Sequence, residues 1–287
     1  MDLGIHYVSY GHPRWETRLV ERLTETARVA DEGGAAWFTV MDHFFQMEAL
    51  GGRDAPMLEG LTALGHLSAV TSRVRLGLLV GGVVHRPPAV LAKAVTTLDV
   101  LSGGRALLGL GASWYQAEAR ALGIDFPPRG ERYERLEETL QLCRRMLAGE
   151  RSSYVGRHVV AEDPANVPPP LGSVPVVVGG SGERRTLRLV AEYADACNLY
   201  AEGPERVRHK LDVLRGHCDG VGRDPAGIRR TIIGHMDPLA DPAGFLTEMS
   251  AYAELGISLV VLSPQGDDPV AWTQRVCAEV LPELQRL

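Results

Sequence analysis

An aspartate and a histidine that follow a short apolar segment are the residues best suited to chemistry in this sequence. The segment Trp37–Val40 is aromatic and β-branched, which is typical of a buried strand, and Asp42 and His43 come directly after it. Proteins that alternate strands and helices carry their reactive groups at the carboxyl ends of the strands. The structural alternative is a capping Asp beside a half-buried His, so the surrounding elements must decide.

A glycine-rich turn is the second candidate site. Gly179, Gly180, Ser181 and Gly182 follow a short apolar segment and precede a helical pattern. Glycines leave backbone N–H groups unobstructed, and the amino end of a helix adds positive partial charge, so such a turn suits a phosphate or carboxylate. The turn lacks the Lys of a Walker loop, and its structural alternative is a tight turn capped by Ser181. The phosphate interpretation is favoured.

Other catalytic patterns have less support. No serine lies in a G-x-S-x-G elbow, and no cysteine has the surroundings of a nucleophile. A metal-dependent barrel hydrolase could draw ligands from five scattered residues, but no paired histidines or H-E-x-x-H motif bring them together. These residues are His6, His43, His85, His235 and Asp237. The hydrolase therefore remains an alternative from a different class.

Alternating strand and helix patterns run along nearly the whole chain and would bring the candidate sites to one face. Eight strand–helix units of about 36 residues each predict an α/β fold, a (β/α)8 TIM barrel that forms a single domain over residues 1–287. Residues 152–172 interrupt the alternation and are interpreted as a short insertion before strand 5. A doubly wound sheet is the rival fold, but no dinucleotide fingerprint follows the first strand. The strands are expected near residues 3–8, 37–40, 74–80, 105–111, 175–178, 196–200, 231–236 and 258–264.

Composition favours a small-molecule enzyme of the cytoplasm. The net charge is -6 and no Lys/Arg block is interleaved with aromatics, so neither nucleic acid nor an anionic membrane is an expected partner. The four cysteines lie far apart without a C-x-x-C pair, as in a reduced cytosolic protein. No apolar stretch approaches the length of a membrane span, and no signal peptide is recognised at the start.

Several motifs, taken in order, resemble the bacterial-luciferase-like oxidoreductase superfamily, and specifically its branch that depends on the deazaflavin coenzyme F420. Each motif is weak alone, and their shared order and spacing carry the resemblance across most of the chain. The motifs are Trp37–Phe44, Val74–Val80 with Arg86–Lys93, Thr97–Arg105, Gly109–Tyr115, and Pro175–Gly182 with Ala191–Asp195.

The resemblance implies a TIM barrel, usually a homodimer, that binds a flavin-like ring at the carboxyl ends of the strands. The ring would lie against strand three, where relatives have a non-proline cis peptide, here by position Leu79–Val80. Asp42 and His43 would lie beside the ring, and the glycine turn would hold the phosphate. The implied cofactor contacts are Asp42, His43, Leu79, Val80, Ala112, Tyr115, Gly179, Gly180, Ser181 and Gly182. Trp15 and Trp114 are expected to wall the substrate pocket.

The implied reaction moves a hydride between the deazaflavin and a small organic substrate with a C=C, C=N or C=O bond. A histidine is suited to exchange the accompanying proton near neutral pH, so His43 is the expected catalytic residue and Asp42 would hold its orientation. Tyr115 and Gln116 stand where relatives often carry Asn and Glu, and the nearest acid is Glu118. An FMN-dependent monooxygenase of the same superfamily is therefore the alternative.

Overall fold

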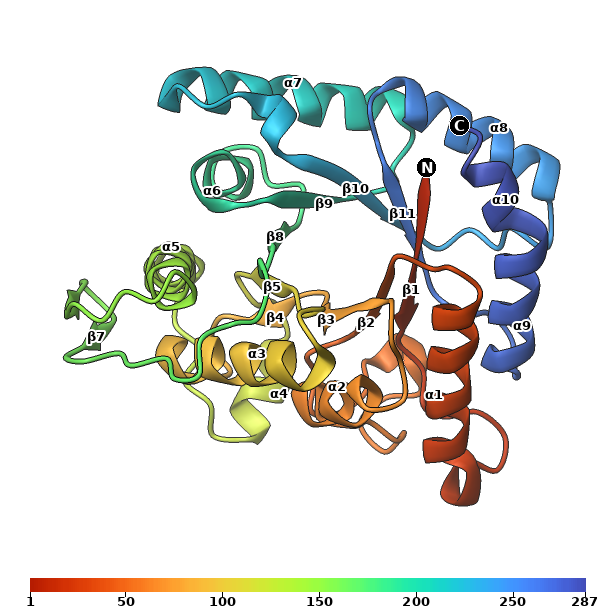
Figure 1. Cartoon of the computed structure of the whole chain (residues 1–287), viewed down its shortest axis with the longest axis horizontal. Coiled ribbons are helices and arrows are strands. Elements are labelled where there is room, and N and C mark those ends of the chain that lie inside the picture. Colours follow the sequence, from red (N-terminus) through yellow and green to blue (C-terminus); the bar gives the residue numbers. More distant parts are fainter.

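Parallel strands form the centre of the molecule and helices cover their outer face (Figure 1). The structure is a computed structural model that describes residues 1–287. The sheet order is β3-β2-β1-β11-β10-β9-β8-β5-β4. Its strands are β1 (Asp2–Tyr7), β2 (Trp37–Val40), β3 (Arg75–Leu78), β4 (Gly81–Gly82), β5 (Leu108–Gly111), β8 (Val176–Gly179), β9 (Ala196–Tyr200), β10 (Arg229–Gly234) and β11 (Leu259–Leu262).

The sheet closes into a barrel where β3 meets β5. Leu76 N–H donates to the carbonyl of Arg105, and Leu107 N–H donates to the carbonyl of Leu76, both at 2.9 Å. β3 and β4 belong to one strand position that is interrupted at the Leu79–Val80 peptide bond, which is cis as the resemblance implies. The eight-stranded barrel predicted from the sequence is confirmed. The strand expected over 74–80 ends at Leu78, and the second short strand of this position, β4, lies just beyond the expected range.

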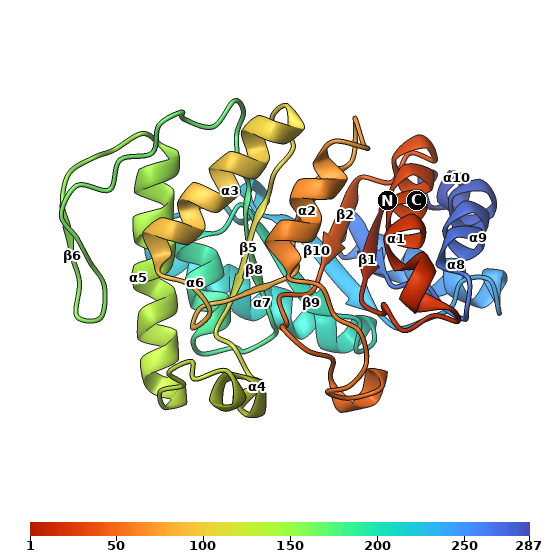
Figure 2. The same cartoon turned by 90° about the horizontal axis from the view of Figure 1, so that it is seen from below.

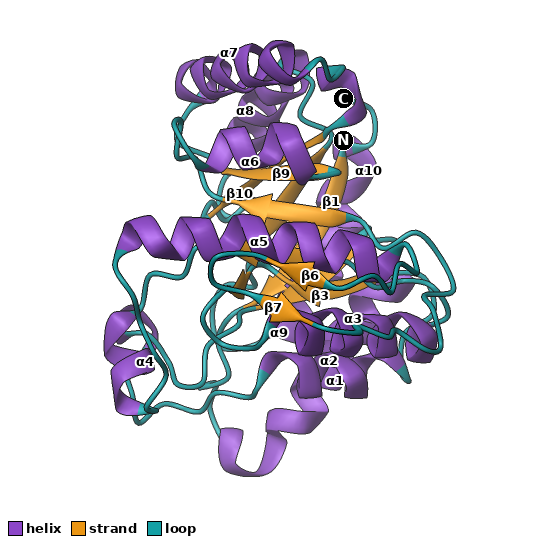
Figure 3. Cartoon of the chain, turned by 90° about the vertical axis from the view of Figure 1, so that its left-hand side faces the viewer, coloured by secondary structure: helices purple, strands orange, loops and turns teal.

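The helices pack around the barrel as neighbouring pairs, with α1 against α9, α2 against α3, α3 against α5 and α6 against α7. Figure 3 shows them enclosing the strands. None of the helices combines the length and the apolar composition that a membrane span requires. The helices are α1 (Trp15–Glu32), α2 (Gly60–Ser68), α3 (Pro88–Ser102), α4 (Gln116–Ala121), α5 (Arg129–Leu147), α6 (Thr186–Tyr193), α7 (Pro204–Val221), α8 (Pro242–Glu254), α9 (Pro269–Arg275) and α10 (Leu281–Leu284), with 3-10 turns at Glu48–Leu50 and Pro225–Gly227 and a π-helical turn at Val276–Val280.

The insertion before the fifth barrel strand contains a hairpin, in which β6 (Tyr154–Val155) pairs antiparallel with β7 (Val160–Ala161). The hairpin lies outside α5 (Figure 2). Glu138 of α5 accepts hydrogen bonds from three successive N–H groups of its turn, those of residues 157–159. Asp99 of α3 accepts hydrogen bonds from the N–H groups of Leu171 and Gly172, so the insertion is fastened at its end as well.

A buried aspartate fastens the end of α1 to the start of β3. The Asp31 carboxylate accepts hydrogen bonds from the N–H groups of Ser72, Arg73 and Val74 and from the Ser72 hydroxyl, at 2.7–3.0 Å. Burial alone would raise the pKa of Asp31, but these hydrogen bonds lower it below its ordinary value. The ionised carboxylate therefore stabilises the fold, and this stabilisation is present above the unfolded-state pKa and is lost as the pH falls.

We predict that Asp31→Ala lowers the free energy of unfolding by about 2–4 kcal/mol, because three backbone donors and one hydroxyl lose a charged acceptor. Urea denaturation at pH 7 measures this loss. The exposed neighbour Glu32 gives the control Glu32→Ala, which should change stability by less than about 0.5 kcal/mol. Equal stabilities of the two variants would contradict the anchoring role of Asp31.

Candidate functional site

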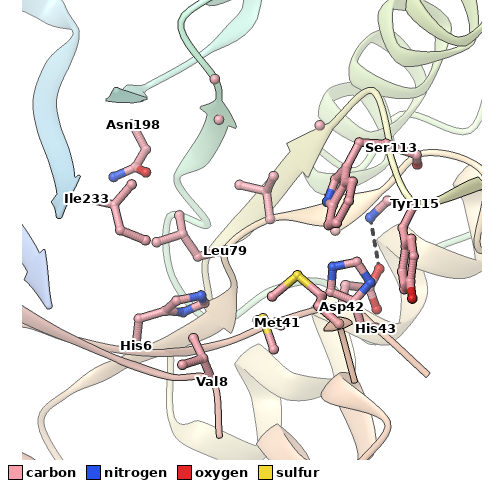
Figure 4. Close-up of a pocket in the computed structure, with 18 of the residues that line it drawn as sticks. His6, Val8, Met41, Asp42, His43, Leu79, Ser113, Tyr115, Asn198 and Ile233 are labelled. Carbon is pink, nitrogen blue, oxygen red and sulfur yellow. Dashed lines mark hydrogen bonds between the residues drawn. The ribbon is translucent and has the colours of Figure 1, made fainter. Parts of the chain in front are cut away.

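A cavity of about 920 Å³ opens at the carboxyl ends of the strands, and all eight strand positions of the barrel contribute to its wall. The close-up in Figure 4 places His6, Val8, Leu79, Ile233 and Asn198 on one side. The other side carries residues that the sequence singles out. The predicted site residues that line the cavity are Asp42, His43, Leu79, Val80, Ala112, Trp114, Tyr115, Gly179, Gly180, Ser181 and Gly182.

Trp15 is the exception among the predicted pocket residues. It begins α1, its surface is 37% exposed, and it is not among the residues that line the cavity. The expectation that Trp15 walls a substrate pocket does not agree with this geometry. Ser9 and His12 of the preceding loop line the cavity, whereas Trp15 is already the first residue of α1, which packs against α9.

His43 is held by Glu118 rather than by its neighbour Asp42. The Nδ1 atom of His43 lies 3.0 Å from Oε2 of Glu118, which is fully buried in α4. The other carboxylate oxygen of Glu118 accepts hydrogen bonds from the N–H groups of Phe44 and Phe45. Burial opposes ionisation, but these hydrogen bonds, with that of His43 first, lower the pKa of Glu118 below its ordinary value.

The ionised state of Glu118 fixes the tautomer of His43. A carboxylate only accepts hydrogen bonds, so Nδ1 of His43 must carry the proton in this contact. Its Nε2 is then the ring atom that can exchange a proton. The ring also packs edge-on against Trp114 and Tyr115, with both centroid distances at 5.7 Å. His43 is therefore held by a charge on one side and by aromatic rings on another.

Asp42 has a different set of partners, which corrects the prediction that it orients His43. Its two oxygens accept a bidentate pair of hydrogen bonds from the Arg86 guanidinium at 2.8 and 2.9 Å. The same carboxylate accepts from the N–H of Gly82, and lies 3.0 Å from Nδ1 of His85. Arg86 and His85 lie more than forty residues further along the chain, so adjacency in sequence did not show the pairing.

The partners of Asp42 keep it ionised. Burial would raise its pKa, but the hydrogen bonds from His85 and Arg86, together with the Arg86 charge, lower the pKa of Asp42 to about 2. Arg86 also pairs with Glu59, the N-cap residue of α2. His85 lies between the carboxylates of Asp42 and Glu118, since its Nδ1 is near Asp42 and its Nε2 lies 3.7 Å from Oε2 of Glu118. Asp42 thus fastens the loop after β4 to the end of β2.

Glycines allow the strands around the cis peptide to approach one another. A β-carbon on Gly111 or on Gly179 would lie 2.8 Å from a methyl group of Val80, which is too close for a real contact. Val80 is half-buried and lies on the cavity wall between these two strands. The glycines at the ends of β5 and β8 therefore permit Leu79 and Val80 to bulge into the cavity.

The glycine-rich turn after β8 lies at the other end of the cavity. The N–H of Gly180 donates to the carbonyl of Asn198, whereas the N–H groups of Ser181 and Gly182 donate to no acceptor in the protein. Gly180 has a φ of 114°, which an L side chain rarely adopts. Arg129 and Tyr133 of α5 line the cavity beside this turn. Free N–H groups and a guanidinium together suit an anion.

Several residues of the site were not assigned from the sequence. The sequence marks Glu118 only as the nearest acid, His85 only as a possible metal ligand and Arg86 only as part of a family motif, because nothing local indicates their partners. His6 lines the cavity, and burial lowers its pKa to about 4, so the ring is neutral. No group of three or more His, Cys, Asp or Glu side chains is arranged to hold a metal ion.

Known proteins resemble this chain along most of its length. The family model described as luciferase-like monooxygenase matches residues 5–255. The F420-dependent glucose-6-phosphate dehydrogenase of Kineococcus radiotolerans is 30% identical over 245 residues, which is 83% of this chain and 70% of that protein.

Solved structures share the fold at lower identity. The coenzyme F420-dependent tetrahydromethanopterin reductase of Methanopyrus kandleri superposes with a TM-score of 0.77 at 16% identity, over 99% of this chain and all of that one. The monooxygenase RslO1 of Streptomyces bottropensis gives a TM-score of 0.77 at 19% identity, over 98% and 99% of the two chains. Because the family model matches residues 5–255 and the chain folds as a barrel, the chain belongs to the luciferase-like monooxygenase family of oxidoreductases.

Proposed function

We propose that the protein is a coenzyme F420-dependent oxidoreductase that transfers a hydride to or from a small organic substrate. One observation carries the proposal: His43, the cis Leu79–Val80 bulge and the glycine turn at residues 179–182 line one continuous cavity. The named activities of the Kineococcus dehydrogenase and the Methanopyrus reductase support this choice of cofactor. The resemblance also leads us to expect a cytoplasmic homodimer.

The cavity fits a flavin-like cofactor at both of its ends. Leu79, Val80 and Ala112 offer an apolar surface for a planar ring, and the glycines around Val80 leave that surface free of other side chains. The N–H groups of Ser181 and Gly182 would hold a phosphate, with Arg129 nearby. A deazaflavin bound there would supply a carbon centre that accepts or donates a hydride.

His43 would manage the proton that accompanies the hydride. Its Nδ1 proton is held by Glu118, so its Nε2 can take a proton from a substrate hydroxyl or return one to a carbonyl. The rings of Trp114 and Tyr115 stack with their centroids 5.0 Å apart and pack edge-on against the imidazole, which limits the orientations of His43. Asp42 would hold the site together without exchanging a proton itself, because its carboxylate forms hydrogen bonds with Gly82, His85 and Arg86.

We predict that purified protein binds coenzyme F420 and quenches its fluorescence with a dissociation constant in the micromolar range, about -8 kcal/mol. FMN should bind more weakly, by at least tenfold, when titrated under the same conditions. FMN is the natural competitor because an FMN-dependent monooxygenase of the same superfamily is the alternative that the sequence leaves open. Tight FMN binding without F420 quenching would overturn the proposal in favour of an FMN-dependent monooxygenase.

We predict that His43→Ala retains coenzyme F420 binding and lowers kcat by about 10²–10⁴-fold, because proton exchange is lost. Glu118→Gln should lower kcat by about 10–100-fold with little change in KM, since an amide no longer fixes the Nδ1 proton.

The exposed Glu16 gives the matched control Glu16→Gln, which should leave kcat unchanged. Circular dichroism and F420 quenching check that each variant is folded and loaded. Full activity in Glu118→Gln would remove Glu118 from the positioning of His43.

A further inference from the structure

The cavity wall contains few Asp, Glu, Lys or Arg side chains, and each of them already has a partner or an expected anion. Asp42 and Glu118 are the carboxylates, and both are already satisfied by protein donors. Arg129 is the single Lys or Arg side chain among the lining residues, and it lies beside the glycine turn. Once a cofactor phosphate occupies that turn, no Lys or Arg side chain in the wall is left for a second anion.

Apart from its histidines, the remaining wall carries no Lys, Arg, Asp or Glu side chain. The carboxyl ends of β1 and β9–β11 and the segment after β2 supply thioethers, aliphatic side chains, amides and hydroxyls. Among them are Val8, Met41, Met47, Asn198, Ile233 and Ser263. His6 is neutral because burial lowers its pKa to about 4, and burial also lowers the pKa of His12. An anion bound against this wall would lose water without gaining a charged partner.

We infer that the substrate is an uncharged molecule with a mainly apolar surface and a hydroxyl or carbonyl group at its reacting carbon. This inference rests on the proposed function and narrows it. The substrate's polar group meets Nε2 of His43, and its apolar remainder packs against Met41, Met47 and Ile233. The amide Nδ2 of Asn198 donates to Thr231, so its oxygen is the acceptor open to a substrate hydroxyl. Sugar phosphates and carboxylates are therefore expected to bind more weakly than uncharged molecules of the same shape.

The test uses two ligands of equal shape that differ in charge. 4-Hydroxycyclohexane-1-carboxamide and 4-hydroxycyclohexane-1-carboxylate are each titrated into coenzyme F420-loaded protein at pH 7.5. Binding is measured by calorimetry and by deazaflavin fluorescence. We expect the carboxamide to bind about 10–100-fold more tightly than the carboxylate, because the carboxylate would bury a charge that has no partner. Equal binding, tighter binding of the carboxylate, or no binding of either would overturn the inference.

A gain-of-charge variant tests the cause. Tyr200 ends β9 on the cavity wall and is 53% exposed, so it tolerates polar replacement. Tyr200→Lys should tighten carboxylate binding by about tenfold and leave carboxamide binding unchanged, as one new ion pair predicts. Tyr200→Gln is the control without charge. If the Lys and Gln variants bind the carboxylate equally, the absence of a cation is not what sets the preference.

The proposed function and this inference fail in different measurements. If the protein does not quench coenzyme F420 fluorescence before any substrate is added, the cofactor assignment is contradicted. The same ligand pair is then titrated by calorimetry into the cofactor-free Arg129→Gln variant, which lacks the one Lys or Arg side chain of the lining, so the charge preference of the remaining wall is measured in either case. Glucose and glucose 6-phosphate form a second pair, in which reduction of the deazaflavin by the phosphate alone would also overturn the inference.

Discussion

The bidentate ion pair between Asp42 and Arg86 is the interaction on which the candidate site depends. Both side chains are removed from water, with 2% and 15% of their surfaces exposed. Removing one partner would leave the other charge buried and uncompensated, which is costly in a protein interior. Because Arg86 also reaches Glu59 at the start of α2, one guanidinium joins β2, α2 and the loop that leads into α3.

Two carboxylates near the end of β2 therefore have different tasks. Asp42 fastens backbone segments to one another, and Glu118 holds the imidazole that faces the cavity. His85 lies between them, with one ring nitrogen near each. Since successive residues beyond a strand can project to different sides, neighbours in sequence need not share a partner. The histidine proposed to exchange the proton is thus held by α4, which follows β5.

The sequence predicted the barrel well because the evidence for it is local. Apolar strands, helical spacing and glycine punctuation recur along the chain, and their order implies the topology. The cis bond at Leu79–Val80 followed from the resemblance. The partners of Asp42 and His43 could not be predicted, because they come from α4 and from the loop after β4, and no spacing rule links those segments. Trp15 was misplaced for a related reason, since loop direction is not encoded in a residue's type.

The cavity wall contributed by β9–β11 takes no part in the charged network around Asp42. Residues such as Tyr200, Ile233 and Ser263 contact neither Arg86 nor Glu118 through any hydrogen bond. Free-energy changes at sites without shared partners are approximately additive. The proposed proton exchange at His43 and the proposed selectivity of this wall therefore rest on separate sets of hydrogen bonds. A new substrate could be accommodated by substitutions in the wall from β9–β11, while the charged network around Asp42 is left unchanged.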